Sequence, residues 1–372
     1  MNIRFTTKRM NMISTKELLI FVYFISFFLR FFTDYATSLT GILCFVSGVI
    51  CFIYLYSKVP KYRRVLQSIA IVICLGLFCT ILSDISKLPN VLYVFTAQVF
   101  GFLLYKKKNN LCFVKLLFMI IYWYLVIRVL FFPRYDAFGG MSFSELCGKN
   151  TISIMMLLAY SIDLIDREVN NKKPNYLLVV IGVIISYLVD SSGGILCFVI
   201  VGLGVFCCKN RKKIAWRRIL FFGLIGIAII MCSGFYIKII DFISDDNSRF
   251  WIWSNYYSCA TSSIRDFLLG ADISGIPFLK EQNNMHNTFI NWHYFMGFLP
   301  FILYNFGFIY IGVKMFSNKK WFFFVIWCST FVRALTDGTD FCFMPLWVFM
   351  YLEIKDSKRL ENVYALRRKS DL

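Results

Sequence analysis

Long apolar runs separated by short polar breaks recur along the whole chain. A helix needs about 20 mostly apolar residues to cross a bilayer, and many of these runs approach that length. The pattern predicts an all-α, polytopic membrane protein with about twelve transmembrane helices in a single domain, 1–372. The expected spans cover residues 18–32, 39–56, 65–83, 91–105, 111–132, 151–165, 176–189, 194–208, 219–237, 288–313, 321–334 and 341–354.

The polar breaks alternate in charge. Lysine and arginine gather in every second loop, as in Lys106-Lys107-Lys108, whereas most acids lie in the other loops. Because basic residues accumulate in cytoplasmic loops, this alternation predicts that both termini are cytoplasmic. The acid-rich side includes the longest connection, a periplasmic loop at 238–287 between the ninth and tenth expected spans. One long loop beside many short ones is typically functional.

The composition agrees with a membrane protein. Of the 372 residues, 59% are hydrophobic and 16% are charged, which leaves too little polar surface for a soluble globule. Lysine and arginine outnumber the acids by 40 to 21. Their placement in alternate loops explains this excess by topology, so we expect no nucleic-acid partner. The 13 cysteines lie mostly in apolar runs and indicate no disulfide framework.

The two histidines of the chain lie seven residues apart, where the long loop enters the tenth expected span. On a helix, this spacing would return His286 and His293 to nearly the same face. A histidine at a membrane interface often serves only as a hydrogen-bonded anchor, and we favour that interpretation for His293. His286 shares its side of the membrane with several arginines, so it is the better candidate for chemistry.

Three arginines lie at the expected exterior ends of spans, where the charge rule disfavours them. Arg30, Arg128 and Arg333 would be explained by ion pairs with nearby aspartates such as Asp337, or by contact with lipid phosphates. Alternatively, they line an outward-facing cationic cavity for a diphosphate, which the planar guanidinium group binds well. Lys115 lies near the cytoplasmic end of its span, and we expect it to extend to the interface.

The long loop contains an arginine followed by aromatic residues. Arg249 precedes Phe250, Trp253, Tyr257 and Thr261, whose spacing predicts an amphipathic helix lying on the membrane. The rings of Trp253 and Tyr257 would serve equally well to stack on a saccharide. Both interpretations fit the residues.

The sequence contains no phosphate-binding loop, no dinucleotide-binding glycine pattern and no zinc-type spacing of histidines or cysteines. We therefore expect neither a cofactor nor a metal. The adjacent pair Asp245-Asp246 is more typical of the start of a helix than of a metal site. Asp163 and Asp190 lie near span ends, and this position argues against an ion-coupled transporter.

Together these features resemble the superfamily of bacterial inner-membrane glycosyltransferases that contains the O-antigen polymerases and O-antigen ligases. The likeness rests on the topology, the long loop before the tenth span, and a His-Asn pair followed after nine residues by Gly-x-x-Gly. Here His286-Asn287 precedes Gly297 at that spacing, and Pro300 replaces the second glycine. A proline there predicts a kink in the tenth span, because it removes the hydrogen bond to the carbonyl of Met296.

Further matches to the superfamily lie outside this pair. They are Arg249 for the loop arginine, Trp253 for the leucine that follows it, Leu269-Gly270 for a Leu-Phe-Gly element, and Gly148-Lys149-Asn150 for the asparagine that opens the sixth span. One position departs from the pattern, because Ser191-Ser192-Gly193 stands where members frequently have Ser-Arg-Gly. The resemblance implies that another arginine supplies that charge, and the candidates are Arg30, Arg128, Arg265 and Arg333.

The resemblance implies transfer of a glycan from undecaprenyl pyrophosphate to a sugar hydroxyl at the periplasmic face, without a metal. Arg249 would stabilise the departing pyrophosphate, and His286 would act as general base with Asn287 as a hydrogen-bond partner. The remaining expected substrate contacts are Arg265, Arg128, Arg30, Arg333, Trp253, Tyr257 and His293.

Within this superfamily we favour a polymerase, which extends another lipid-linked repeat, over a ligase, which transfers the glycan to lipid A–core. A lipid-linked oligosaccharide flippase or polysaccharide exporter is the alternative from a different class. The expected partners are the undecaprenyl-pyrophosphate-linked oligosaccharide, the lipid bilayer, a chain-length regulator and a flippase.

Overall fold

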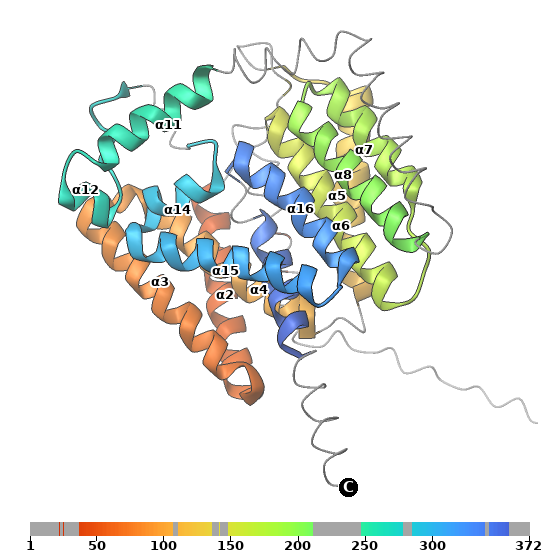
Figure 1. The fold of residues 1–372 in the computed structure, drawn as a ribbon, viewed down its shortest axis with the longest axis horizontal. Helices are drawn as coiled ribbons and strands as arrows, with labels where there is room; N and C mark the ends of the chain where they lie inside the picture. Colours follow the sequence, from red (N-terminus) through yellow and green to blue (C-terminus); the bar gives the residue numbers. More distant parts are fainter. Residues whose placement is uncertain are drawn as a thin grey trace, which may run out of the picture.

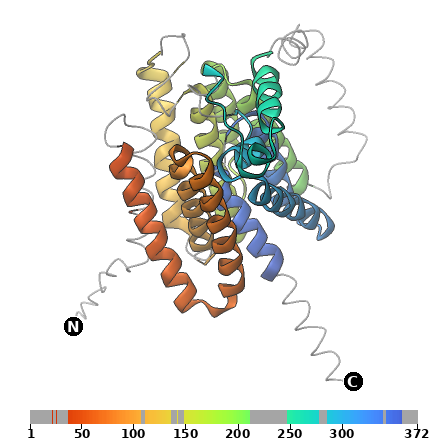
Figure 2. The ribbon, with the colours of Figure 1, turned by 90° about the vertical axis from the view of Figure 1, so that its left-hand side faces the viewer.

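The computed structural model describes residues 37–106, 111–135, 141, 148–210, 247–277, 285–338 and 342–356, together with 22 and 25. These residues form helices joined by short connections, and no strand occurs among them apart from one isolated bridge between Tyr135 and Met141 (Figures 1 and 2). The longer helices are α2 (Thr37–Lys58), α3 (Arg63–Ser83), α4 (Leu88–Lys106), α5 (Leu111–Phe131), α6 (Lys149–Val169), α7 (Tyr176–Leu188), α8 (Ser192–Lys209), α11 (Asn247–Ala260), α15 (Phe298–Ser317), α16 (Trp321–Thr336) and a last helix at 342–356. Two short helices, α12 (Ile264–Leu269) and α14 (Thr288–Met296), complete the set used below.

Within the described residues, six helices are long and apolar enough to cross a membrane, namely Gly41–Lys58, Pro60–Ser83, Ile85–Tyr105, Phe113–Phe131, Ser192–Lys209 and Phe298–Ser317. The protein is thus a multi-pass membrane protein. Two shorter apolar helices, α7 and α16, coincide with other expected spans. The expected spans 18–32 and 219–237, and with them Arg30, fall outside the described residues except for positions 22 and 25, so the number of crossings stays a prediction.

The outer surfaces of the long helices are apolar. Ile42 on α2, Ile71 and Phe78 on α3, and Leu116 on α5 are all more than half exposed. Large apolar side chains gathered on an outer face are costly in water but suit contact with lipid. These exposed apolar side chains agree with the assignment of these helices as membrane-crossing, which rests on length and composition.

The last helix, 342–356, lies at the centre of the bundle. Phe349 contacts Tyr105 of α4 and Phe323 of α16, with ring centroids 5.2 and 6.2 Å apart. Trp347 packs on Phe308 of α15, with centroids 4.7 Å apart. On one side of this helix α5, α6, α7, α8 and α16 pack together, and on the other α2, α3, α4, α14 and α15 do so (Figure 1).

The expected tenth span is broken, but not by its proline. α14 ends at Met296 and α15 begins at Phe298, and Gly297 between them has φ +77°. Pro300 lies in the first turn of α15, where a missing backbone N–H costs nothing. The prediction of a kink caused by Pro300 was wrong, because the left-handed backbone at Gly297 makes the break three residues earlier.

Lys115 also differs from its prediction. Its Nζ lies 3.1 Å from a carboxylate oxygen of Asp163 and 3.1 Å from one of Asp166, both of which are buried. Arg167 pairs with Asp163 at 2.6 Å. Lys115 turns into the bundle instead of extending to the interface, because two buried carboxylates are costly without opposite charge.

Candidate active site

The C-terminal end of α16 carries a buried ion pair. Arg333 lies in the last turn of the helix, and Asp337 follows as its C-cap residue. Arg333 Nη1 is 3.2 Å from Asp337 Oδ2, and the two side chains are only 1% and 6% exposed. A charge buried this deeply persists only when it is paired and hydrogen-bonded. The ion-pair interpretation of Arg333 is therefore confirmed.

Arg333 also joins α16 to the N-terminal ends of α6 and α8. Its Nη2 donates to the main-chain oxygen of Asn150 at 3.1 Å and to Ser153 Oγ at 3.1 Å, and it lies 3.4 Å from Ser191 Oγ. Gly193 leaves room for the guanidinium group, because a Cβ at this position would overlap Arg333 Nη1. The structure thus places an arginine from α16 against the turn at 191–193, where the sequence itself has none.

His286 lies on the other side of the same aspartate. Its Nδ1 is 3.6 Å from Asp337 Oδ1, which is beyond hydrogen-bond distance, and this oxygen accepts a hydrogen bond from Asn150 Nδ2 at 3.4 Å. Thr288 Oγ1 donates to the main-chain oxygen of Asp337 at 2.8 Å and so fixes this turn against α14. The His286 side chain is 27% exposed, so one part of it faces the buried Asp337 and another part is open to a reactant.

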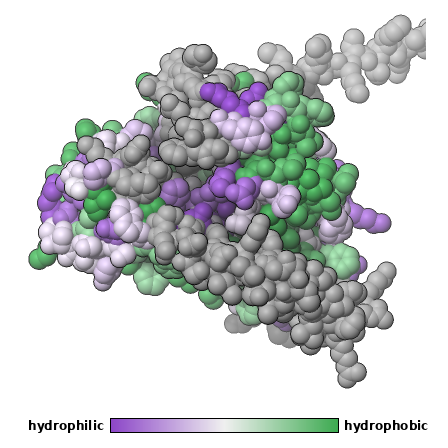
Figure 3. Space-filling view, turned by 90° about the horizontal axis from the view of Figure 1, so that it is seen from above, coloured by the Kyte–Doolittle hydropathy of each residue, from purple (hydrophilic) through white to green (hydrophobic). Residues whose placement is uncertain are grey.

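We call His286, Asp337, Arg333, Asn150, Ser153 and Ser191 the polar cluster. Its members come from four parts of the chain that meet at one end of the bundle. Seen from above, hydrophilic residues gather near the middle of this end of the molecule, with apolar surface beside them (Figure 3). Lys149 and Asp190 form an exposed ion pair at 3.0 Å, one residue away in sequence from Asn150 and Ser191.

Asn287 holds the backbone next to His286 and does not contact the imidazole in any hydrogen bond of its side chain. Its Oδ1 accepts from the main-chain N–H groups of Phe289 and Ile290 at 2.9 and 3.2 Å, which caps α14. Its Nδ2 donates to the main-chain oxygen of Leu335 at 3.1 Å. His286 just before this cap has φ +48°, so its side chain leaves the backbone in an uncommon direction.

α11 is fastened beside His286 through Trp253. Its indole N–H donates to the main-chain oxygen of Met285 at 2.8 Å, and the Met285 N–H donates to Asn291 Oδ1 at 2.9 Å. Arg249 lies one helical turn before Trp253 on α11 and is half-buried. The structure therefore brings the helix that carries Arg249 against the backbone preceding His286.

One face of α11 is buried against the bundle. Ile252, Tyr256 and Ala260 are buried, whereas Phe250 and Tyr257 are exposed. Tyr257 thus points away from the bundle. Exposed rings at Phe250 and Tyr257 are compatible with the predicted contact of this helix with the membrane surface, which stays a prediction.

His293 lies away from the polar cluster. Its Nε2 is 2.7 Å from the main-chain oxygen of Phe267, which can only accept, so Nε2 carries the proton. Tyr256 Oη is 2.5 Å from Nδ1 and therefore donates to it. Burial raises the pKa of Tyr256, so this hydroxyl keeps its proton. His293 uses both ring nitrogens to tie α11 and α12 to α14.

Arg265 and Arg128 are not part of the polar cluster either. Arg265 Nη2 donates to the main-chain oxygen of Leu82 at 2.9 Å and so caps the end of α3. Beside it, hydrogen bonds from Ser263 lower the pKa of Asp266, which keeps this turn of α12 charged. Arg128 is half-buried in the last turn of α5.

The sequence analysis missed part of this arrangement. Asp337 was considered only as an ion partner for an arginine, and Ser153 and Thr288 were not singled out. The four-residue spacing of Arg333 and Asp337 on one helix face was the available signal. Lys87 was also missed: it is buried, donates to the main-chain oxygen of Ala271 at 3.1 Å, and lies 4.1 Å from the ring centroid of Tyr294.

No protein-family model matches this sequence, and the comparison with curated proteins gives no match either. In the part of the chain that the structure describes, no group of three or more histidine, cysteine, aspartate or glutamate side chains could hold a metal ion. The polar cluster offers an imidazole 3.6 Å from a carboxylate, with a guanidinium group on the other side of that carboxylate.

Proposed function

We propose that the protein is a glycosyltransferase of the bacterial inner membrane that polymerises surface polysaccharide such as O-antigen. In this proposal, the donor is a glycan on undecaprenyl pyrophosphate, and the acceptor is a sugar hydroxyl of another lipid-linked repeat. Both termini would be cytoplasmic, and the polar cluster would face the periplasm. A chain-length regulator and a flippase are proposed as partners.

The observation that carries the proposal is the position of His286 between solvent and Asp337. A neutral imidazole can take the proton from an attacking hydroxyl, and a carboxylate beside it stabilises the imidazolium that forms. Arg333 lies on the other side of Asp337, with its Nη1 3.2 Å from Asp337 Oδ2. The carboxylate of Asp337 thus supports His286 as a general base.

The departing pyrophosphate needs positive charge, and we assign this role first to Arg249. Its helix is fastened beside His286 through Trp253 and Met285. A guanidinium group binds phosphate oxygens in pairs and retains its charge at all relevant pH values. Arg333 has a different task, because its Nη1 already contacts Asp337 and its Nη2 already binds helix-end oxygens. Arg333 thus places a positive charge beside Ser191-Ser192-Gly193, where the family's arginine is missing, and its role is structural.

The test is transfer by the purified full chain in lipid nanodiscs, supplied with a lipid-pyrophosphate-linked repeat. His286→Gln is expected to lower turnover by about 10²–10⁴-fold, which is what general-base catalysis contributes. His293→Gln serves as the matched control and should retain most of the activity of the folded fraction. Normal turnover by His286→Gln at normal protein levels would refute the assignment.

Cells carrying the same variants separate polymerase from ligase. Loss of a polymerase leaves surface caps of a single repeat, whereas loss of a ligase leaves bare core and accumulated lipid-linked polymer. A flippase would instead leave the repeats on the cytoplasmic side and would not depend on His286.

A further inference from the structure

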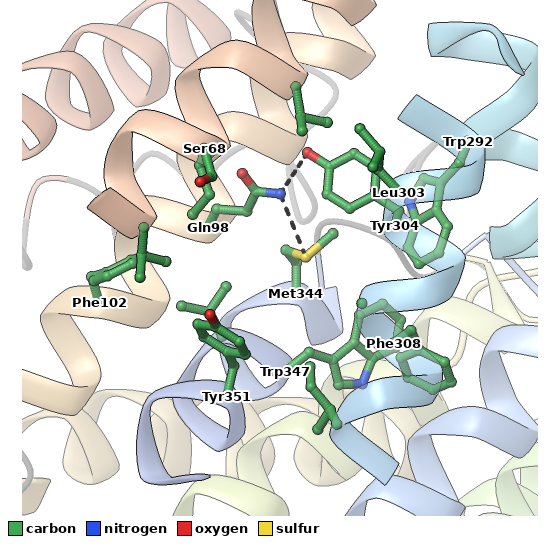
Figure 4. A pocket seen from close by; sticks show the side chains of 16 residues that line it. Ser68, Gln98, Phe102, Trp292, Leu303, Tyr304, Phe308, Met344, Trp347 and Tyr351 are labelled. Atoms are coloured by element: carbon green, nitrogen blue, oxygen red, sulfur yellow. Dashed lines mark hydrogen bonds between the residues drawn. The ribbon is translucent and has the colours of Figure 1, made fainter. Parts of the chain in front are cut away.

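An apolar pocket lies between α3, α4, α15 and the last helix, with Trp292 of α14 in its wall (Figure 4). Its empty space is about 860 Å³, including its open mouth. Aromatic rings from four helices line it, among them Tyr304, Phe308, Trp347 and Tyr351. None of these residues belongs to the polar cluster.

The walls place this pocket at the depth of the bilayer. α3, α4 and α15 are among the helices long and apolar enough to cross a membrane. On α15 the lining positions extend from Leu303 to Ile311. At 1.5 Å per residue this is a length of about 12 Å, which suits a stretch of hydrocarbon chain. A pocket with such walls excludes a charged headgroup, because nothing in it would compensate for lost hydration.

One part of the pocket is polar. Gln98 Nε2 donates to Tyr304 Oη at 2.6 Å, whereas Gln98 Oε1 and Trp292 Nε1 have no hydrogen-bond partner among the described residues. Both side chains are almost fully buried, at 2% and 1% exposure. Buried polar atoms without partners are uncommon in proteins, and they typically mark a ligand or an ordered water. The pocket therefore has a polar part next to α14, and its other walls are mostly apolar.

α14 connects this polar part to the polar cluster. Its first residue, Thr288, bonds to Asp337, and Trp292 follows four residues later, about 6 Å along the helix. A chain held in the pocket with its polar end at Trp292 would thus end near the turn that carries His286.

We infer that this pocket binds the polyprenyl chain of the lipid-linked donor, with its phosphate-bearing end towards α14. This inference rests on the proposed function. We favour a polyprenyl chain over a phospholipid acyl chain. The pyrophosphate end of the donor must reach His286, so the chain attached to it needs a site next to α14, whereas an acyl chain does not. The ring faces of the pocket also suit contact with an unsaturated chain.

Gly307 allows the pocket to be filled without disturbing the backbone. It lines the pocket, and a Cβ at this position would meet no atom within 4 Å. Gly307→Phe puts a ring into the space where the chain would lie. Val313→Phe is the matched control, because Val313 is on the same helix but faces outward and is 57% exposed.

The measurement is retention of undecaprenyl phosphate by the full chain in nanodiscs of phosphatidylethanolamine and phosphatidylglycerol, followed by native mass spectrometry. Excluding two or more chain carbons should weaken retention by about tenfold in Gly307→Phe. Val313→Phe should retain the lipid as the unaltered protein does. Equal retention by both variants would overturn the inference, and so would selective loss of phospholipid, which would identify an acyl-chain site.

His286→Gln keeps this result separate from the proposed function. It leaves the pocket intact, so it should lose turnover and still retain undecaprenyl phosphate. If it stays active while Gly307→Phe loses the lipid, the catalytic assignment fails and the chain site stands. If it loses turnover while Gly307→Phe retains the lipid, only the chain site fails.

Discussion

At the scale of single residues, the polar cluster depends on a charge that is almost completely withdrawn from solvent. Arg333 is stabilised by Asp337 on one side and by main-chain and hydroxyl oxygens of α6 and α8 on the other. Removal of a partner from a buried ion pair is costly, because the other charge stays buried. Asp337 therefore has two effects: it neutralises Arg333, and its other carboxylate oxygen lies 3.6 Å from His286 Nδ1, where it can stabilise the imidazolium.

Asp337→Asn tests the second effect, with turnover expressed per folded protein, because the variant also leaves Arg333 without its counter-charge. Asparagine keeps the shape and most hydrogen bonds but cannot stabilise the imidazolium of His286. Turnover should fall by at least about tenfold and by no more than the 10²–10⁴-fold that a general base contributes, and KM should change little. Steady-state kinetics in nanodiscs give both parameters. The matched control is Asp190→Asn, because the Asp190 carboxylate is exposed and its pair with Lys149 contributes little.

Unchanged kcat in Asp337→Asn would show that His286 works without this carboxylate. A parallel fall in Asp190→Asn would show that the loss comes from the charge of this end of the protein in general.

Predictions about single residues were correct where the interacting residues are close together in the sequence. Arg333 and Asp337 are four residues apart on one helix, so their ion pair was among the expected alternatives. Asn150 and Ser191 contact the same guanidinium from positions more than a hundred residues away, and no spacing in one sequence reveals that contact. Lys115 was misplaced for the same reason, because its partners lie on the next helix.

At the scale of elements, the apolar runs predicted helices well, since burial in lipid or protein demands the same helical backbone throughout. Each expected span that falls in the described residues coincides with one helix, except the tenth, which is divided into α14 and α15. The break at Gly297 was missed because a single glycine in an apolar run is compatible with an unbroken helix. Its φ of +77° belongs to the junction between α14 and α15, where it lies beside Leu268 of α12.

This break should be sensitive to a single methyl group. A Cβ at Gly297 would lie 2.6 Å from the main-chain oxygen of Leu268, and the left-handed backbone costs about 1–2 kcal/mol for other residues. Gly297→Ala should therefore lower the temperature of half-unfolding, measured by tryptophan fluorescence in detergent. Gly307→Ala is the control, and we expect it to raise stability by about 1 kcal/mol, as alanine does in helices. Equal stability of both variants would contradict the role of Gly297.

At the scale of the whole molecule, the two ends of the bundle differ in chemistry. One end carries the polar cluster and α11, and the other carries the basic loops after α2, α6 and α8. Ser191 at the start of α8 lies in the polar cluster, whereas Lys209 at its end pairs with Glu168 near the end of α6. α8 has 18 residues, so these two sites are about 27 Å apart.

This geometry bears on the expected ninth span. Asn210 follows α8 at one end of the bundle, and α11 begins at Asn247 and contacts Met285 at the other. The expected span 219–237 lies between these residues but outside the described part of the chain, so this crossing stays a prediction. Fusions to alkaline phosphatase, which is active only after export, test it at two positions. A fusion after Asn210 should be inactive and one after Pro277 active, while green fluorescent protein at the C-terminus should fluoresce. Equal phosphatase activity at both positions would remove the ninth span and place His286 on the same side as the basic loops.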